Sequence, residues 1–438
     1  MKYLILLFFL GFAQAQDTVT VVAVGEAEVE KDLISVVLKR SDDLTAAEIV
    51  SLKQLEEVLK SDFDFYRNLF EVDKESYDSA KKAKGRYVIF LEAKKDKSTV
   101  KLSISLRDKT QDKELFKSEK NLPNRFVRRF SHQIADDLYR VITGKESIFM
   151  TKIYFIADKG SNLNKVQKDI YVMDFDGANK KRLTYLRSMV ISPALSFDNK
   201  RLLYSVIETG LKKASSGKGM QRVKNINLHL LNLDTMKSRM VSNVDGINSG
   251  AIFNKSGDSI YLTLSYLKNA DIYKLNLKTG KKRRITSHFS DDVDPHINGD
   301  ESQLTFLSGR PGKAMIYTLD PSGVEKKVKR IGFVGRFNAA PRFNPQGSEI
   351  VFSSWVDERF DIYRIDNDGR NLVRLTKDFG SNEEPWFSPD GEFIVFTSQR
   401  VISRKKAVQD IYIMNREGEI IRKITDGFGK VYTPRWSN

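Results

Sequence analysis

The sequence contains no cysteine, and only 4 histidines in 438 residues. Without cysteine the chain can form no disulfide and has no attachment point for a lipid. The histidines show no metal-ligand spacing, and no Gly-x-Ser-x-Gly motif of a hydrolase nucleophile is present. The sequence therefore predicts no catalytic residue, no cofactor, no metal site and no enzyme activity. The histidines are His132, His229, His288 and His296.

Long apolar runs are also missing, apart from one at the start of the chain. Lys2 precedes an apolar run over residues 4–12. This run is followed by Ala13-Gln14-Ala15, a small-x-small cleavage pattern. A membrane anchor is the alternative, but a spanning helix needs about 20 apolar residues. We therefore expect a signal peptide at residues 1–15, a mature chain that begins at Gln16 without a membrane span, and a location in a bacterial periplasm.

The net charge is +16, from 73 Lys and Arg against 57 Asp and Glu. Nearly all of this surplus lies after residue 150. A basic surplus is typical of nucleic-acid-binding proteins, but here the basic residues are scattered over turns and strand ends, and an exported protein meets no nucleic acid. We expect no nucleic-acid partner; the simplest interpretation is a solvated surface, followed by attraction to anionic components of the cell envelope.

Two interleaved motifs recur through the second half of the chain at a period of about 45 residues, which is the size of a propeller blade. One motif has the form EPWFSPDGEFIVFTS, the other the form DIYRIDNDGRNLVRLT. In both, alternating apolar residues flank a turn such as Asp390-Gly391, as in a hairpin. The first motif begins at Ser192, Gly250, Asp294, Ala340 and Glu384; the second at Asp169, Asn227, Asp271, Met315, Asp361 and Asp410.

The two ends of this array complement each other. The chain ends in TPRWSN, the start of a first hairpin, whereas KIYFIAD at residues 152–158 lacks the strand that should precede it. Pairing them makes a sixth blade and leaves no open sheet edge. We therefore predict an all-β six-bladed propeller at residues 147–438, closed by a C-terminal strand; a β-sandwich is the alternative.

The preceding residues 16–146 read as a small α/β N-terminal domain. TVTVVAV at residues 18–24 predicts a strand, and Thr45-Ala-Ala-Glu48 is a capping box that opens an amphipathic helix. Residues 86–93 and 99–108 predict a strand pair. Residues 124–143 predict a helix that ends at Gly144, followed by a short join at residues 145–149.

The loops that precede the inner strands should converge on one end of the channel, the mouth, where a rigid frame holds their side chains around a concave site. Asp291, Asp292 and Asp294 could form a cation site there, but a solvated acidic turn is the simpler interpretation. The predicted mouth residues are Arg187, Ser188, Asn248, Ser249, Asp292, Asp294, Arg336, Asn338, Asn382, Glu383, Glu384, Lys430 and Tyr432.

An export signal, an α/β domain and a six-bladed ring in this order resemble the TolB family of the Tol-Pal envelope system. HQIADDLYRVITGKESIFMTKIYFIADKG, at residues 132–160, looks like the family's domain junction, and Ser388-Pro-Asp-Gly391 like its blade turn. The chain departs from the pattern where Gly250 replaces the inner-strand proline, and in a basic insert at residues 210–224. The resemblance covers essentially the whole mature chain.

This resemblance implies a monomeric periplasmic scaffold for protein–protein interaction that maintains outer-membrane integrity and supports constriction during cell division. The mouth would receive the peptidoglycan-associated lipoprotein Pal. The mature N-terminus, with Gln16, Asp17, Thr18 and Val19, would engage the inner-membrane protein TolA. A peptidoglycan or carbohydrate binder that uses Trp355 and Trp386, and an exported hydrolase, are the alternatives.

Overall fold

The computed structural model describes residues 30–79, 81–159, 161, 166–213, 220–267, 269–403 and 406–438. The expected signal peptide, the strand predicted at residues 18–24 and the mature N-terminus at Gln16 lie outside these residues. Within them, no helix is both long enough and apolar enough to cross a membrane.

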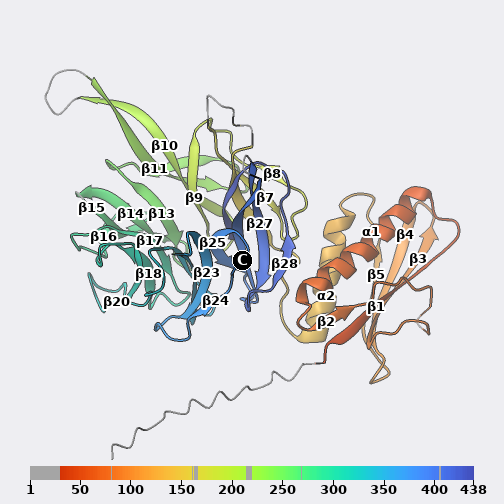
Figure 1. The fold of residues 1–438 in the computed structure, drawn as a ribbon. Coiled ribbons are helices and arrows are strands. Elements are labelled where there is room, and N and C mark those ends of the chain that lie inside the picture. Colours follow the sequence, from red (N-terminus) through yellow and green to blue (C-terminus); the bar gives the residue numbers. More distant parts are fainter. Residues whose placement is uncertain are drawn as a thin grey trace, which may run out of the picture.

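The N-terminal domain is built on a five-stranded mixed sheet with the order β2-β1-β3-β4-β5 (Figure 1). The predicted strand pair is confirmed, since β3 and β4 run antiparallel from Tyr87↔Asp108 to Asp96↔Thr99. The sequence analysis missed β1, which is the central strand that pairs in parallel with both β2 and β3. The strands are β1 (Asp32–Arg40), β2 (Phe70–Val72), β3 (Tyr87–Asp96), β4 (Thr99–Asp108) and β5 (Lys113–Asn121).

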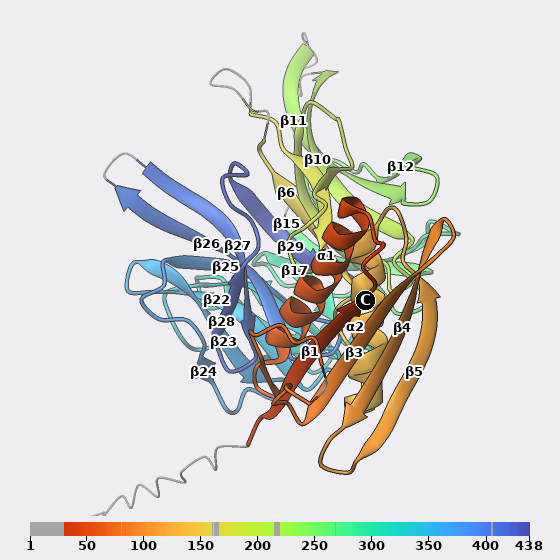
Figure 2. The same ribbon diagram turned by 90° about the vertical axis from the view of Figure 1, so that its right-hand side faces the viewer.

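Two helices, α1 (Ala46–Phe63) and α2 (Val127–Thr143), pack side by side in this domain (Figure 2). The capping box that opens α1 is present: the Glu48 carboxylate accepts from the Thr45 backbone N–H at 2.8 Å. The helix α2 ends at Gly144 with φ 70°, a left-handed conformation that glycine adopts at little cost. A short 3-10 helix, η1 (Asp64–Tyr66), follows α1 and leads toward the propeller.

The remaining chain forms six four-stranded antiparallel sheets arranged as a ring, as predicted. Within each blade, the strand named first in the lists of strands below lies innermost in the ring. Three blades are β9 (Met189–Leu195), β10 (Arg201–Lys213), β11 (Met220–Asn232), β12 (Ser238–Ser242); β13 (Asn248–Phe253), β14 (Ser259–Leu267), β15 (Asn269–Asn276), β16 (Lys282–Arg284); and β17 (Asp292–Ile297), β18 (Leu304–Ser308), β19 (Met315–Leu319), β20 (Lys329–Arg330).

The ring is closed by a composite blade with the order β29-β6-β7-β8, which confirms the predicted closure by the C-terminal strand. Strand β29 pairs antiparallel with β6 from Val431↔Ala157 to Trp436↔Ile153. The other strands are β21 (Asn338–Phe343), β22 (Glu349–Val356), β23 (Arg359–Asp366), β24 (Val373–Arg374); β25 (Ser381–Phe387), β26 (Phe393–Ser403), β27 (Lys406–Asn415), β28 (Ile420–Lys423); and β6 (Lys152–Ala157), β7 (Asp169–Asp174), β8 (Lys181–Arg182), β29 (Val431–Trp436).

Each inner strand contains a bulge at a residue with positive φ, directly before a proline in five of the six blades. The pairing with the second strand shifts its register at the same place. In β13 the left-handed residue is Gly250 and Ala251 stands at the proline position, so the expectation that Gly250 replaces the proline was off by one residue. The left-handed residues are Ser192, Gly250, Asp294, Ala340, Glu384 and Thr433.

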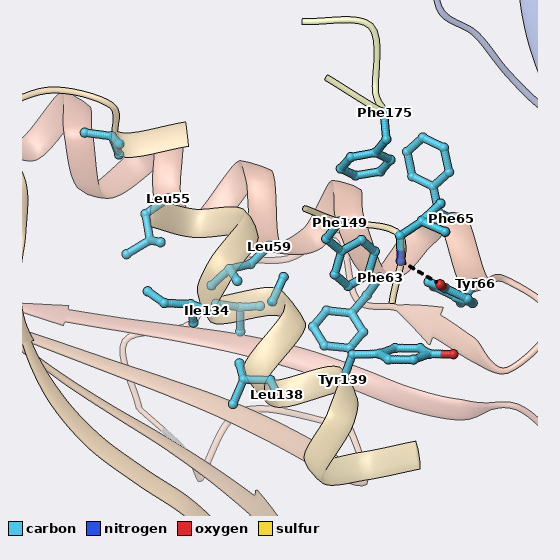
Figure 3. Packing of buried hydrophobic residues seen from close by; sticks show 14 of the residues in the cluster. Leu55, Leu59, Phe63, Phe65, Tyr66, Ile134, Leu138, Tyr139, Phe149 and Phe175 are labelled. Atoms are coloured by element: carbon cyan, nitrogen blue, oxygen red, sulfur yellow. Dashed lines mark hydrogen bonds between the residues drawn. The ribbon is translucent and has the colours of Figure 1, made fainter. Parts of the chain in front are cut away.

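The two domains share one hydrophobic core, which is rich in aromatic rings (Figure 3). Phe65 of η1 lies 5.0 Å, between ring centroids, from Phe175 of the propeller. The residues that join the domains are part of this core, because Ile148 and Phe149 are fully buried and the Ile148 N–H donates to the Tyr66 hydroxyl at 3.1 Å. The join is therefore a packed element.

Candidate functional site

The two ends of the propeller have different neighbours. In a four-stranded antiparallel blade, the start of the inner strand and the hairpin between the second and third strands lie at one end of the ring. The N-terminal domain contacts the opposite end, where the Tyr66 hydroxyl donates to Asp390 at 2.7 Å in the β25–β26 turn. The mouth, formed by the loops before the inner strands, therefore lies at the end of the ring remote from this contact.

Two ion pairs fill the channel below the mouth. The Arg342 guanidinium donates to both carboxylate oxygens of Asp294, at 2.8 and 3.1 Å, and Arg435 donates to Glu384 at 3.1 Å. Each pair joins neighbouring blades. Both arginines are buried and lie one residue after the inner-strand proline. Equivalent positions in the six blades hold Ala194, Ile252, His296, Arg342, Trp386 and Arg435.

The Trp386 ring lies at the centre of this layer. The guanidinium carbons of Arg435 and Arg342 lie 4.8 and 5.7 Å from its centroid, and His296 packs edge-on at 5.1 Å. Burial and the two guanidinium groups hold the pKa of His296 well below its usual range, so its Nδ1 accepts from the Phe343 N–H. A void of ≈ 10 Å³ remains, roughly the space of one water. The channel is filled at this level.

Four of the predicted mouth residues are buried and have a structural role. The Asn248 side-chain amide donates to Ile226 and Val244 carbonyls, and Asn382 donates to the Asp361 carboxylate. Asn338 donates to the Val334 carbonyl, and Asp292 pairs with Arg310 at 2.9 Å. Because these side chains satisfy backbone and charged groups within the blades, they do not contribute to the exposed surface of the mouth. The four residues are Asn248, Asp292, Asn338 and Asn382.

The acidic turn that contains Asp291, Asp292 and Asp294 is not arranged as a cation site, and not all three of its carboxylates are exposed to solvent. Asp292 and Asp294 are each bound by an arginine, and the exposed Asp291 accepts from the Ala270 N–H at 2.8 Å. Glu384 likewise lies in an ion pair inside the channel. The sequence contained a signal for the two channel ion pairs. Only two of the six inner strands, those with APRF and TPRW, have an arginine directly after the proline.

The remaining predicted residues do surround the mouth. Arg187, Arg336 and Lys430 are exposed, and their side chains have no ion-pair partner among the described residues. Ser188, Ser249 and Tyr432 are partly buried, with the Lys168 ammonium 3.6 Å from the centroid of the Tyr432 ring. The mouth thus combines free cations with partly buried polar groups.

Glu383 is the acidic exception among these residues. Its side chain is partly buried and has no hydrogen bond or ion pair within the described part of the chain. Burial, together with the neighbouring Glu384 carboxylate, raises its pKa to about 7. An unpaired carboxylate that is costly to ionise is suited to receive a cationic group from a partner.

Three exposed aromatic residues of the mouth were missed by sequence reasoning. Tyr185, Phe289 and Phe333 are 70%, 84% and 69% exposed in the loops that lead into β9, β17 and β21. The signal was available, because an aromatic residue recurs in most of these loops. Of the aromatics that were singled out, Trp355 stacks on Phe337 inside its own blade, and Trp386 lies in the channel layer.

One cluster of metal-ligating side chains lies between the domains. Asp62, His132 and Asp176 bring one ligand atom each within 4.8 Å of one another. The cluster is already paired without an ion: His132 Nδ1 lies 2.7 Å from Asp62, and Arg128 forms an ion pair with Asp176. Burial raises the pKa of Asp62 to about 6, against the opposing hydrogen bond from His132. We interpret it as a polar contact between the domains.

Comparison with known proteins agrees with this architecture. The chain is 25% identical over 329 residues to the Tol-Pal system protein TolB of Francisella tularensis subsp. holarctica (strain OSU18), which covers 73% of this chain and 71% of the relative. It is 28% identical to the protein TolB homolog of Chlorobium luteolum (strain DSM 273 / BCRC 81028 / 2530), over 71% of this chain and 65% of that one.

The crystal structure of TolB from Acinetobacter baumannii has the same fold, with a TM-score of 0.73 at 20% identity over 94% of this chain and 98% of that chain. The sequence model described as the TolB beta propeller domain matches residues 139–339 and 326–438. These two matches include most of the domain junction, all six blades and the closing strand. The chain therefore belongs to the TolB family.

Proposed function

We propose that this chain is a periplasmic scaffold of the Tol-Pal system that has no enzymatic activity and binds one partner at the mouth of the propeller and another at its mature N-terminus. The mouth binds a Pal-like peptidoglycan-associated lipoprotein, and the mature N-terminus at Gln16, Asp17, Thr18 and Val19 engages a TolA-like inner-membrane protein. A monomer with these two partners would link the outer membrane to the inner membrane, maintain outer-membrane integrity and support constriction during division.

The observation that carries this proposal is the contrast between the filled channel and the unpaired side chains above it. Because Arg342, Arg435 and Trp386 occupy the channel, a partner would seat on the mouth and would not thread through the ring. The mouth offers exposed aromatic rings, the cations Arg187, Arg336 and Lys430, and Glu383, whose side chains form no ion pair with any residue that the structure describes. Charged and aromatic groups held on a rigid frame are typical of protein interfaces.

Calorimetric titration with a Pal-like domain tests the proposal. Arg336→Ala and Glu383→Gln should each weaken binding, by about 2 kcal/mol or more where the group pairs with a buried partner charge. Both variants should melt like the wild type, because Arg336 has no ion pair in the described chain and Glu383 is unpaired. Lys281→Gln, exposed at the other end of the ring, is the matched control.

The pH dependence sharpens this test. Since the pKa of Glu383 is about 7, the carboxylate is largely neutral at pH 6 and largely ionised at pH 8. Binding of a cationic partner group should therefore strengthen from pH 6 to pH 8, and Glu383→Gln should remove that change. Equal affinities of all variants at both pH values would exclude the mouth as the binding site.

A further inference from the structure

We propose that the end of the channel opposite to the mouth holds a second binding site, for a small molecule that joins an aromatic ring to an anionic group. The site is a cavity of ≈ 290 Å³, which we call the turn cavity. It is surrounded by the turns that follow the inner strands of five blades and by the residues that follow β29. Binding there does not depend on a protein partner at the mouth.

The turn cavity lies directly beneath the channel layer and has a largely apolar lining. Ile252, His296 and Trp386 of that layer form its floor. Every blade adds the apolar residue at the end of its inner strand, so that six blades contribute to one ring of side chains. Because most of these side chains are aromatic, the ring is suited to a flat apolar group. The six residues are Leu195, Phe253, Ile297, Phe343, Phe387 and Trp436.

The size of the turn cavity favours a small molecule over a protein. Small-molecule sites typically have volumes of about 300 to 1,000 Å³, and this cavity lies at the lower end of that range. The described residues of the N-terminal domain do not line it, although that domain contacts the same end of the ring through Tyr66 and Asp390. At the rim of the cavity, Phe197 is 54% exposed and Lys255 is exposed, so the cavity opens to solvent.

Two cations lie beside the aromatic rings at this rim. The Lys255 ammonium lies 5.7 Å from the centroid of the Phe197 ring. The guanidinium carbon of Arg201 lies 5.1 Å from the centroid of the Phe253 ring. Neither cation forms an ion pair within the described part of the chain. One sector of the rim, between the blades that begin with β9 and β13, therefore carries positive charge next to aromatic surface.

Carboxylates in the same set of turns are already bound by the chain itself. Asp198 accepts from the Lys200 N–H at 3.1 Å. Glu301 forms an ion pair with Lys274 at 3.0 Å. Because the two rim cations lack such a partner among the described residues, the anionic group of a ligand would bind at this sector, with its aromatic ring seated in the apolar ring of the cavity.

Calorimetric titration with 2-naphthoate tests the proposal, on the chain that begins at Gln16 because the apolar leader would itself attract an aromatic probe. We expect saturable one-to-one binding that weakens at high salt. Phe197→Ala should weaken binding about fivefold, because the naphthyl ring loses an aromatic neighbour. Lys255→Gln should weaken it about threefold, as for an exposed charge pair. The neutral analogue 2-naphthamide should bind more weakly than 2-naphthoate and should not respond to Lys255→Gln.

A third variant fills the cavity without removing a side chain. A Cβ at residue 299 would meet only the Pro345 carbonyl oxygen, at 3.6 Å, which is an ordinary contact. Gly299→Leu therefore fits the folded chain, and it should weaken binding of both probes about tenfold or more, because its side chain competes with them for the same space. All three variants should melt like the wild type, since Phe197 and Lys255 are exposed and residue 299 lies in a turn.

Two matched controls separate the turn cavity from the rest of the surface. Phe333→Ala removes an exposed ring at the mouth, where the Arg330 guanidinium carbon lies 4.4 Å from its centroid. Lys281→Gln removes an exposed charge in the β15–β16 turn, at the same end of the ring as Lys255 but outside the cavity. Both controls should bind 2-naphthoate like the wild type.

Absence of saturable binding of 2-naphthoate, or an equal loss in cavity and control variants, would overturn the proposal. So would a loss in Phe333→Ala without one in Phe197→Ala, because the probe would then bind at the mouth. Binding of a peptide with a C-terminal tryptophan, but not of 2-naphthoate, would also contradict it, because the cavity would then be a site for a protein segment.

Discussion

The two ends of the propeller use the same kinds of side chain in opposite ways. At the end that faces the N-terminal domain, aromatic rings are buried against Phe65 and Tyr66, and the carboxylates Asp176 and Asp390 are bound by partners from the other domain. At the mouth, Phe289 and Phe333 are exposed, and Arg336 has no ion pair within the described segments of the chain. The difference is that part of one end is covered by the N-terminal domain, whereas the described residues place no other domain over the mouth.

The strongest test of this contrast removes the strand that closes the ring. Deletion of residues 432–438 takes away most of β29, including Trp436, whose burial alone is worth about 3 to 5 kcal/mol. It also exposes the edge of β6 and leaves Glu384 without Arg435. We expect aggregation or loss of cooperative unfolding, measured by circular dichroism and size-exclusion chromatography. A truncated chain that melts like the full one would mean that the ring is closed in another way.

A charge inside the channel should matter more for stability than a charge on the mouth. Glu384→Ala leaves the guanidinium of Arg435 buried without its partner, which typically costs about 3 to 5 kcal/mol. Arg336→Ala, on the exposed mouth, should change the free energy of unfolding by less than about 0.5 kcal/mol. Urea denaturation of both variants compares them, and similar free energies would contradict the assignment of Glu384 to the channel.

The contact between the domains should show an intermediate effect. Tyr66→Phe removes a hydroxyl that donates to Asp390 and accepts from the Ile148 N–H, so a partly buried carboxylate and a buried N–H lose a partner. A loss of about 1 to 3 kcal/mol in the free energy of unfolding follows. Tyr185→Phe, on the exposed mouth, is the matched control and should unfold like the wild type. A silent Tyr66→Phe would show that the hydroxyl is dispensable for the contact.

The smallest expected effect concerns pH. Asp62 holds its proton up to about pH 6 in the folded chain, whereas its ordinary pKa is 3.8. The folded state therefore binds the proton more tightly than the unfolded state does. The protonated Asp62 contributes fully to the free energy of unfolding below about pH 4, and this contribution is lost as the pH rises to about 6. Relative to Asp62→Asn, the wild type should lose about 2 kcal/mol of stability over that range. Parallel stability profiles of the two proteins would rule out this titration.

The elements that could be predicted are those specified by local pattern. The alternation and turns of the repeats define the blades, and the incomplete units at residues 152–158 and 433–438 identify the closing blade. Thr45 and Gly144 mark helix ends through contacts with residues three or four positions away. In each case the determining interaction is short in sequence or repeated.

The elements that were missed depend on contacts that no local pattern shows. Strand β1 is followed by the turn residues Asp42 and Asp43, so its existence could have been predicted, but its central place in the sheet depends on parallel pairing with β2 and β3. Asp62, His132 and Asp176 meet only because two domains pack together. At the mouth, position alone could not separate the buried Asn382 from the unpaired Glu383, because neighbouring residues of a strand point to opposite sides.

The closing strand has a consequence for the order in which the chain can fold. Strand β6 begins at Lys152, but its inner partner β29 begins at Val431, and the Trp436 indole donates to Thr151 across this junction. The composite blade cannot be completed until β29 is available, whereas every other blade is formed from contiguous residues. Such a long-range pairing slows folding and leaves one edge of β6 open in the meantime. Pairing of β29 with β6 is therefore the step that closes the ring.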